Sequence, residues 1–535
     1  MNMATTTATS TSTSTSVDTA GNGVTRRADR PKDSEGSSNG SSSGPGDDGS
    51  VTDPTIEQLR RSFRRKYRHV EAVHSESKPS CLSHDTTETP SFLGFRNLMV
   101  IMLVVGNLRL VIENIQKYGV LICVRCHDFR KSDVQLGLIL YFLIPCHLLM
   151  AYLVELVAAR SARSSRIKVD KRRHAGSSSP TEDEYQKFQA TWKMVWVAHA
   201  LNVTCALAFT TYMVYYEIHH PLIGTLTEMH AVIVWLKTAS YAFTNRDLRH
   251  AYLHPVKGEL DALPELYKQC PYPQNITIGN LVYFWWAPTL VYQPVYPRTR
   301  EIRWVFVAKR VGEVVCLSVF IWFASAQYAA PVLRNSLHKI ASLDYPSILE
   351  RLLKLSTISL VIWLAGFFAL FQSFLNALAE VTQFADRSFY EAWWNSESLG
   401  TYWRTWNKPV YQFFKRHVYS PMRSRGWSHK MASLTVFLLS AILHELLVGV
   451  PTHNLIGVAF LGMFLQLPLI QLTAPLEKVK SANGRLLGNI IFWTSFTIFG
   501  QPFAALMYFY AWQAKYGSVS KQVLAAHASG QHCPA

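Results

Sequence analysis

The sequence has few charged residues, and this scarcity limits the kind of protein that it can encode. Asp, Glu, Lys and Arg make up 17% of the 535 residues, whereas 49% are hydrophobic and 13% aromatic. Soluble globular proteins carry about 25% charged residues. The hydrophobic residues are also concentrated in long runs. The composition therefore argues against a soluble protein and predicts an all-α, polytopic membrane protein with its bulk in one helical bundle.

Disulfides, metal-binding motifs and a signal peptide are also missing from the sequence pattern. The eight cysteines are scattered, and several lie in apolar runs, which argues against a disulfide framework. Residues Cys123 to His127 spell the C-x-x-C-H string of covalent haem attachment. They have no small soluble domain around them to enclose a haem, so we interpret this match as accidental. The first residues lack the basic and apolar regions of a signal peptide.

Nine apolar runs are long enough to cross a membrane as helices. Basic residues gather in the connections 159–192 and 381–430, which lie on the same side as the basic N-terminal tail if all nine runs cross. Cytosolic loops carry an excess of Lys and Arg, so this side is predicted to be cytosolic and the C-terminus lumenal. The expected spans are 96–115, 134–158, 193–216, 221–243, 304–330, 356–380, 431–451, 455–473 and 486–512.

The apolar run from Ser433 to Val450 contains two adjacent ionisable residues, His444 and Glu445. Such groups are costly to bury in a membrane, so they indicate a functional or a paired site. The zinc-protease motif H-E-x-x-H is excluded, because Val448 stands four residues after His444. Three interpretations stay open on these residues alone. They are a reaction centre, the proton relay of a transporter, and a structural pair in which the His bonds a backbone carbonyl.

Aromatic and basic residues alternate through residues 381–430 without forming a membrane-spanning run. This composition is typical of amphipathic helices that lie in the membrane interface. Such a layer beside the His444 helix would form the mouth of a site, and an ordinary aromatic belt is the alternative. Its densest part contains Phe389, Tyr390, Trp393, Trp394 and Asn395.

Several motifs in this sequence resemble those of the membrane-bound O-acyltransferases, particularly their type 1 diacylglycerol acyltransferase branch. FYEAWWN at 389–395 resembles the FYxDWWN element of that family, and SAILHE at 440–445 resembles its histidine helix. The likeness runs from about residue 95 to 512. One position departs from the pattern, because Ala392 replaces the acidic residue and Glu391 stands one place earlier, so that its carboxylate would have to reach the same partners from a different helical face. Further matching stretches are 107–114, 272–275, 287–293 and 395–398.

The resemblance implies a helical bundle around an intramembrane reaction tunnel, in the endoplasmic reticulum membrane and as a homodimer or homotetramer. The implied reaction joins a fatty acyl group from acyl-CoA to diacylglycerol, with sterol acyl transfer as the alternative. No metal or cofactor is expected, and acyl-CoA is a co-substrate.

Two residues carry the predicted chemistry. His444 would be the general base, since imidazole titrates near neutral pH. Asn407 would donate a hydrogen bond to the thioester oxygen as that oxygen gains charge. Glu445 lies about 100° around the helix from His444, so an orienting or structural role is expected for it. The predicted substrate-binding set is Trp406, Gln466, Gln501, Glu445, Lys430 and Tyr419.

Residues 1–90 are rich in Ser, Thr and Gly, which predicts a disordered cytosolic tail. A membrane-embedded domain at 91–515 and a short tail at 516–535 would follow. A basic segment at 60–69, with Phe63 and Tyr67 among its Arg and Lys residues, is typical of contact with a membrane surface or with acyl-CoA. A solvated signal is the alternative interpretation.

We expect deletion of residues 1–50 to leave activity nearly intact, because this sequence has little to pack. Deletion through residue 90 should alter the oligomer or the dependence on acyl-CoA, since it removes the basic segment. Size-exclusion chromatography in detergent measures the oligomer of each deletion variant, and activity at a series of acyl-CoA concentrations measures its dependence on acyl-CoA. Full-length behaviour of both would mean that the segment is only a solvated tail.

Overall fold

A computed structural model of the protein describes Leu103, Leu108 and residues 110–119, 130–174, 182–253, 265–341, 344–477 and 482–528. The predicted tail with its basic segment, most of the expected span at 96–115, and the Cys123–His127 string lie outside these residues. All named elements of the described chain are helices. A single isolated β-bridge joins Arg298 and Phe384. The predicted all-α fold is therefore confirmed.

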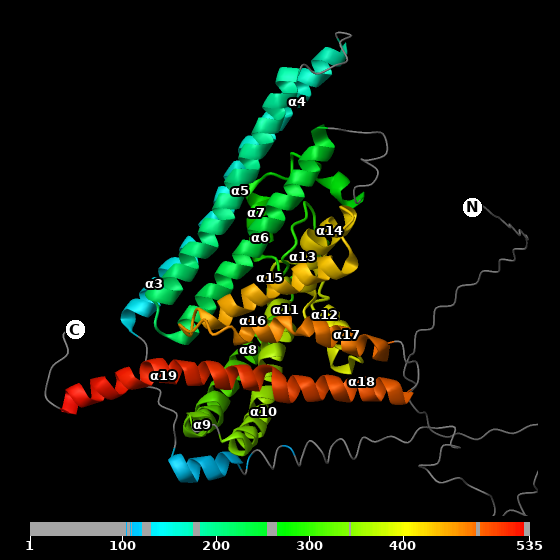
Figure 1. Cartoon of the computed structure of the whole chain (residues 1–535). Coiled ribbons are helices and arrows are strands. Elements are labelled where there is room, and N and C mark those ends of the chain that lie inside the picture. The colour runs from blue at the N-terminus through cyan, green and yellow to red at the C-terminus, as the bar shows by residue number, and fades with distance from the viewer. Residues whose placement is uncertain are drawn as a thin grey trace, which may run out of the picture. The chain divides into compact units, whose positions relative to one another are not determined.

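Four helices from the first half of the chain pack side by side, and Figure 1 shows them in cyan and green. The predicted loop at 159–192 is instead largely helical, because α4 continues far beyond its apolar part and α5 begins early. The basic residues of this connection therefore lie on helical extensions. The four helices are α3 (Lys131–Leu143), α4 (Cys146–His174), α5 (Glu182–Tyr216) and α6 (Pro221–Leu253).

A second group of helices packs around α10 and is continued by three π-helical segments. Its last helix, α19, runs to Ala528 and so extends into the predicted C-terminal tail. The group consists of α8 (Trp304–Ala324), η2 (Ser325–Ala329), α9 (Ala330–Ala341), α10 (Tyr345–Phe367), η3 (Phe368–Phe374), α11 (Leu375–Val381), α18 (Ala482–Thr494), η6 (Ser495–Gly500) and α19 (Gln501–Ala528).

The His444 helix, α15 (His429–Gly449), contacts both α6 and α16 (Val458–Phe464), and α17 (Gln466–Glu477) follows α16. Short helices precede α15, as expected of an interfacial layer. Residues 385–392 are not helical, so the expectation that Glu391 occupies a different helical face was wrong. The remaining short elements are η1 (Glu265–Gln269), α7 (Ile278–Trp286), η4 (Trp393–Asn395), α12 (Leu399–Thr405), α13 (Lys408–Phe414), η5 (Lys415–Tyr419) and α14 (Ser420–Ser424).

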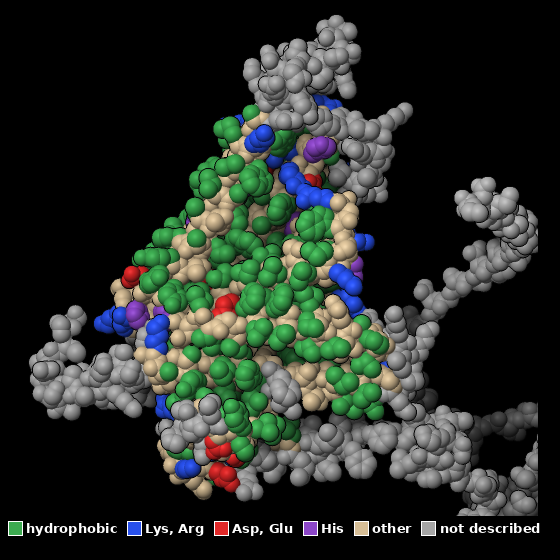
Figure 2. All heavy atoms as spheres, viewed as in Figure 1, with side chains coloured by type: hydrophobic (Ala, Val, Ile, Leu, Met, Phe, Trp, Pro, Cys, Tyr) green, Lys and Arg blue, Asp and Glu red, His purple; other side chains and the backbone are tan. Residues whose placement is uncertain are grey.

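Six helical stretches of the described chain are long and apolar enough to cross a membrane. Two further expected spans, 221–243 and 304–330, are helical but are not among the six, and charged residues such as Lys237 and Arg310 interrupt both. In the face shown in Figure 2, hydrophobic side chains cover the middle, and Lys and Arg gather at the margins. The six stretches are Lys131–Ile167, Ala190–Tyr216, Tyr345–Val381, His429–Gly449, Val458–Leu476 and Gly484–Lys515.

A buried lysine fixes the short helix α7 against α6. The Nζ atom of Lys237, a residue only 5% exposed, donates to three backbone carbonyls at the end of α7. The distances are 2.8 Å to Phe284, 3.1 Å to Trp285 and 2.8 Å to Ala287. An ammonium group has three hydrogens, so each of them meets one carbonyl.

A buried ionic cluster holds α4, α5 and α6 together. Glu155 is fully buried and lies 2.5 Å from Arg249 Nη1 and 2.9 Å from His199 Nε2. The Arg249 guanidinium also lies 4.0 Å from the centre of the Trp192 ring. One carboxylate thus meets partners from two neighbouring helices, which compensates for its removal from water.

We expect Arg249→Met to destabilise the protein strongly, because it leaves Glu155 buried without its cation. Breaking a buried pair in this way costs about 3–5 kcal/mol. Arg246→Met is the matched control, since Arg246 pairs with Asp247 at the exposed surface, where such pairs contribute about 0–1 kcal/mol. Thermal denaturation followed by size-exclusion chromatography in detergent measures both. Equal melting temperatures for the two variants would contradict a stabilising role of the cluster.

Candidate active site

His444 lies on α15 with one ring nitrogen bonded and the other available. Its Nδ1 atom is 2.7 Å from the carbonyl oxygen of Ser440, one turn earlier. A carbonyl oxygen only accepts, so Nδ1 carries the hydrogen, and Nε2 of the neutral ring carries the lone pair. Nε2 has no hydrogen-bond partner among the described residues, and the side chain is only half-buried. The ring is therefore oriented by its own helix and can accept a proton at Nε2.

Glu445 faces another direction and holds the start of α16. Its carboxylate accepts hydrogen bonds from the backbone N–H of Gly457 at 2.9 Å and of Phe460 at 3.0 Å. The Tyr508 hydroxyl, on α19, donates to it at 2.7 Å. Gly457 precedes α16 and has no side chain to cap that helix. Glu445 therefore caps α16 from outside and joins three helices, which is a structural role.

Asn407 combines a local structural bond with an unused donor. Its Oδ1 atom accepts from the Val410 N–H at 3.2 Å and so caps α13. Its Nδ2 group has no hydrogen-bond partner within the described part of the chain. Phe413 on α13 and Leu443 on α15 belong to one buried hydrophobic cluster. The helix that Asn407 caps thus shares a hydrophobic cluster with the residue next to His444.

The aromatic element at 389–395 forms a packed core rather than a substrate surface. Phe389 is 2% exposed and Trp393 is 1% exposed. The Trp393 ring lies edge-on to Trp363, with centroids 5.2 Å apart, and to Phe367 at 5.1 Å. Tyr390 packs at the edge of this core, 5.1 Å from Phe367 between ring centroids, and donates to Gln372 at 2.6 Å, while Trp394 and Asn395 are exposed.

The aromatic element is also bound to the backbone on both sides of Asn407. The Glu391 N–H donates to the Thr405 carbonyl at 2.8 Å, and the Lys408 N–H donates to the Phe389 carbonyl at 3.0 Å. The Glu391 carboxylate forms an ion pair with Lys408 Nζ at 2.6 Å. The sequence did not identify Lys408 as the partner of Glu391, because a positive charge alone does not show which carboxylate it pairs with. In this chain Glu391 thus supplies a carboxylate that anchors the residue after Asn407.

The remaining predicted residues occupy different surroundings. Both ends of the Gln466 amide are bonded, to the Gly462 carbonyl at 3.1 Å and to Trp403 Nε1 at 3.3 Å. Gln501 is half-buried at the start of α19. Among the others, Trp406 stacks on Tyr402 with centroids 5.8 Å apart, Tyr419 lies 2.6 Å from His429 Nδ1, and Lys430 is exposed.

His417 is a polar residue near α15 that sequence reasoning missed. It lies on η5, which contacts α15, and its Nε2 atom is 2.7 Å from Ser240 Oγ on α6. The Tyr292 N–H donates to the same hydroxyl at 2.8 Å. Burial, together with Arg416 and Arg246, lowers the pKa of His417 to about 4. The ring is therefore neutral at physiological pH, and its hydrogen bond with Ser240 ties η5 to α6.

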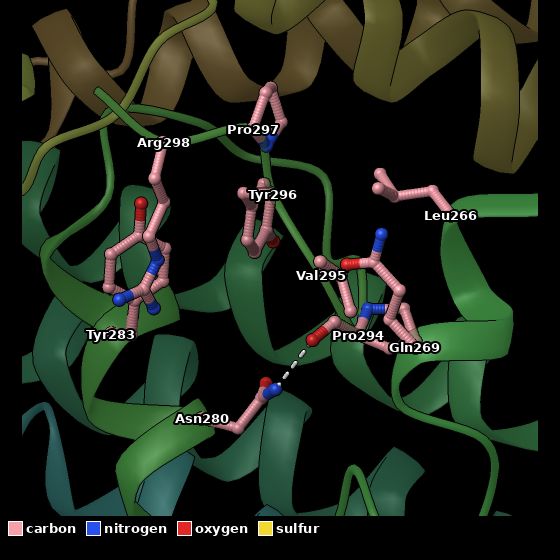
Figure 3. Close-up of a pocket in the computed structure, with 9 residues that line it drawn as sticks. All are labelled: Leu266, Gln269, Asn280, Tyr283, Pro294, Val295, Tyr296, Pro297 and Arg298. Atoms are coloured by element: carbon pink, nitrogen blue, oxygen red, sulfur yellow. Dashed lines mark hydrogen bonds between the residues drawn. The ribbon is translucent and has the colours of Figure 1, made fainter. Parts of the chain in front are cut away.

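Two cavities in the described chain lie apart from these residues. One, of about 520 Å³, is shown in Figure 3, where Asn280 bonds the Pro294 carbonyl and the Arg298 guanidinium stacks on Tyr283. The other, of about 690 Å³, lies between α5, α6 and α15 and includes Leu446. Leu446 stands two residues after His444, and two residues turn a helix by about 200°. This groove therefore faces away from His444. The first cavity is lined by Leu266, Gln269, Asn280, Tyr283, Pro294, Val295, Tyr296, Pro297 and Arg298.

Comparison with known proteins gives one family and a consistent set of relatives. Residues 184–510 match the model of the membrane-bound O-acyltransferase family. Diacylglycerol O-acyltransferase 1C of Glycine max is 34% identical, over 85% of this chain and 82% of its own length. Diacylglycerol O-acyltransferase 1 of Arabidopsis thaliana is 34% identical, over 85% and 80%. The protein of the same name from Dictyostelium discoideum is 33% identical, over 81% and 64%.

We expect Glu445→Gln to lower the melting temperature, because an amide cannot accept all three hydrogen bonds of the carboxylate. A hydrogen bond to a charged group contributes about 1.5–3 kcal/mol. Tyr508→Phe removes only one of the three bonds and should have a smaller effect. Thermal denaturation of the purified protein measures both variants. An unchanged melting temperature combined with lost activity would instead assign Glu445 to the reaction.

Proposed function

The chain belongs to the membrane-bound O-acyltransferase family, and we propose that it transfers a fatty acyl group from acyl-CoA to the free hydroxyl of diacylglycerol, forming triacylglycerol. The observation that carries this proposal is the likeness to diacylglycerol O-acyltransferases over more than four fifths of the chain. The motifs at 389–395 and 440–445 support it, because they lie within the matched residues 184–510.

His444 is the general base in this proposal. Its Nε2 removes the proton of the diacylglycerol hydroxyl as the oxygen attacks the thioester carbon. The C–S bond then breaks, an ester C–O bond forms, and the proton passes from His444 to the sulfur of the leaving CoA. The hydrogen bond from Nδ1 to the Ser440 carbonyl supports this role, since it keeps the lone pair on Nε2. Transfer is direct, without an acyl-enzyme and without a cofactor.

Asn407 stabilises the oxygen of the thioester as negative charge develops on it. This role suits its Nδ2 group, which has no partner within the described chain, while its Oδ1 atom is fixed by the Val410 N–H. The side chain is thereby held in place before the substrate binds, which is the condition for an effective donor. Trp406, Gln466 and Gln501 belong to the proposed chamber around the two reacting groups.

Acyl-CoA enters from the cytosol in this proposal, and diacylglycerol enters from the bilayer. Lys430 is exposed at the start of α15, close in sequence to Arg423 and Arg425, which suits the anionic phosphates of CoA. Tyr419 joins η5 to the same helix end through His429. We further propose an endoplasmic reticulum membrane location, a cytosolic N-terminus, a lumenal C-terminus, and a homodimer or homotetramer.

We expect the purified protein to acylate diacylglycerol in preference to a sterol, and His444→Ala to abolish this activity. The variant should fold normally, because the side chain bonds only within its own helix. Product formation from labelled acyl-CoA with each acceptor, at matched protein levels, tests both statements. Preference for the sterol would overturn the proposed acceptor, and substantial turnover by a normally expressed His444→Ala protein would exclude His444 as the base.

A further inference from the structure

One amide side chain fastens the end of the aromatic element to α18. Asn489 Nδ2 lies 3.0 Å from the carbonyl oxygen of Trp394 and 3.0 Å from that of Ser396. A carboxamide nitrogen carries two hydrogens, one for each carbonyl. Trp493, one turn later on the same helix face, donates from Nε1 to the Trp394 oxygen at 3.1 Å. One face of α18 thus holds two carbonyls at the end of η4.

Gly488 allows the backbone of α18 to approach the backbone of Glu397, after η4, closely. A Cβ atom on Gly488 would overlap the Glu397 carbonyl oxygen and would lie 3.1 Å from its carbonyl carbon and 3.3 Å from its Cα. These are backbone atoms, which cannot rotate away as a flexible side chain could. The segment after η4 therefore rests directly on α18, beside the amide of Asn489.

The other end of the same segment is bound on both sides of Asn407. The backbone bonds of Glu391 to Thr405 and of Lys408 to Phe389 enclose that residue, and the Glu391–Lys408 ion pair strengthens the attachment. Between the two ends, the Trp393 side chain is 1% exposed in the aromatic core. A continuous series of contacts therefore runs from α18 to the residues on both sides of Asn407.

We propose that Asn489 is a positioning residue for Asn407. By holding the Trp394 and Ser396 carbonyls, it fixes the segment 389–396 and, through that segment, the backbone that carries the Asn407 amide. This inference rests on the proposed function, in which Asn407 donates to the developing oxyanion. Asn489 acts through the protein chain and touches neither substrate.

The test replaces Asn489 by Leu, which has a similar shape and no donors. A displacement of about 1 Å at a reacting group can cost on the order of 10²-fold in rate. We expect Asn489→Leu to lower kcat by roughly 10- to 100-fold and to leave the KM for acyl-CoA unchanged. The matched control is Leu487→Ala, since Leu487 is 51% exposed on the same helix. Trp493→Phe removes one of the three donors and provides a milder variant if Asn489→Leu does not fold.

A double-mutant cycle separates positioning from a general loss of structure. If Asn489 acts through Asn407, adding Asn489→Leu to Asn407→Ala should lower kcat no further. An equal loss in both backgrounds would overturn the proposal, and so would a normal kcat in the single Asn489→Leu variant.

Hydrogen exchange provides a readout that does not depend on the reaction. Asn489→Leu should speed amide exchange across residues 389–413, which include the held segment 389–396 and Asn407, and Leu487→Ala should not. Unchanged exchange in Asn489→Leu would overturn the proposed positioning even if activity fell. If the wild-type protein acylated no hydroxyl acceptor, the proposed function would fail, while the exchange comparison would still decide whether Asn489 holds this segment.

Discussion

A backbone N–H or C=O that leaves its helix in an apolar surrounding needs another partner, because no water is available to bind it. Side chains from neighbouring helices meet this need at several points in the described chain. Lys237 donates to carbonyls at the end of α7, and Asn489 donates to carbonyls at the end of η4. Glu445 accepts from backbone N–H groups at the start of α16. Each of these side chains ties a short element to a longer helix, so these short elements take their positions from the bundle.

The same principle explains why His444 and Glu445 differ although they are adjacent. His444 bonds a carbonyl of its own helix and keeps one nitrogen available, whereas Glu445 accepts three hydrogen bonds from outside its helix. Consecutive residues of a helix differ in direction by about 100°, so Glu445 reaches α16 and α19 while His444 faces another side of α15. Two adjacent residues can therefore have different roles, with His444 offering a reactive nitrogen and Glu445 holding neighbouring helices together.

Apolar runs and helical periodicity predicted the membrane helices and separated Glu445 from His444, because both follow from local sequence. The long extensions of α4 and α5 were not predicted, since charged residues were interpreted as a loop. The contacts of Lys408 with Glu391 and of Asn489 with Trp394 were also missed. They join residues 17 and 95 positions apart, and a single amide or charge leaves no periodic pattern from which its distant partner can be inferred.

The π-helical turns have a consequence for how this chain can vary over evolutionary time. A π turn holds one more residue than an α turn, and each residue rotates a helix by about 100°. Gln501 directly follows the π segment η6, so the direction in which it points depends on the number of residues in that segment. Loss of one residue between Ser495 and Gly500 would turn the start of α19 and bring a neighbouring side chain to the same place. Related proteins could thus change the lining of this region by insertion or deletion alone, with no substitution at the position itself.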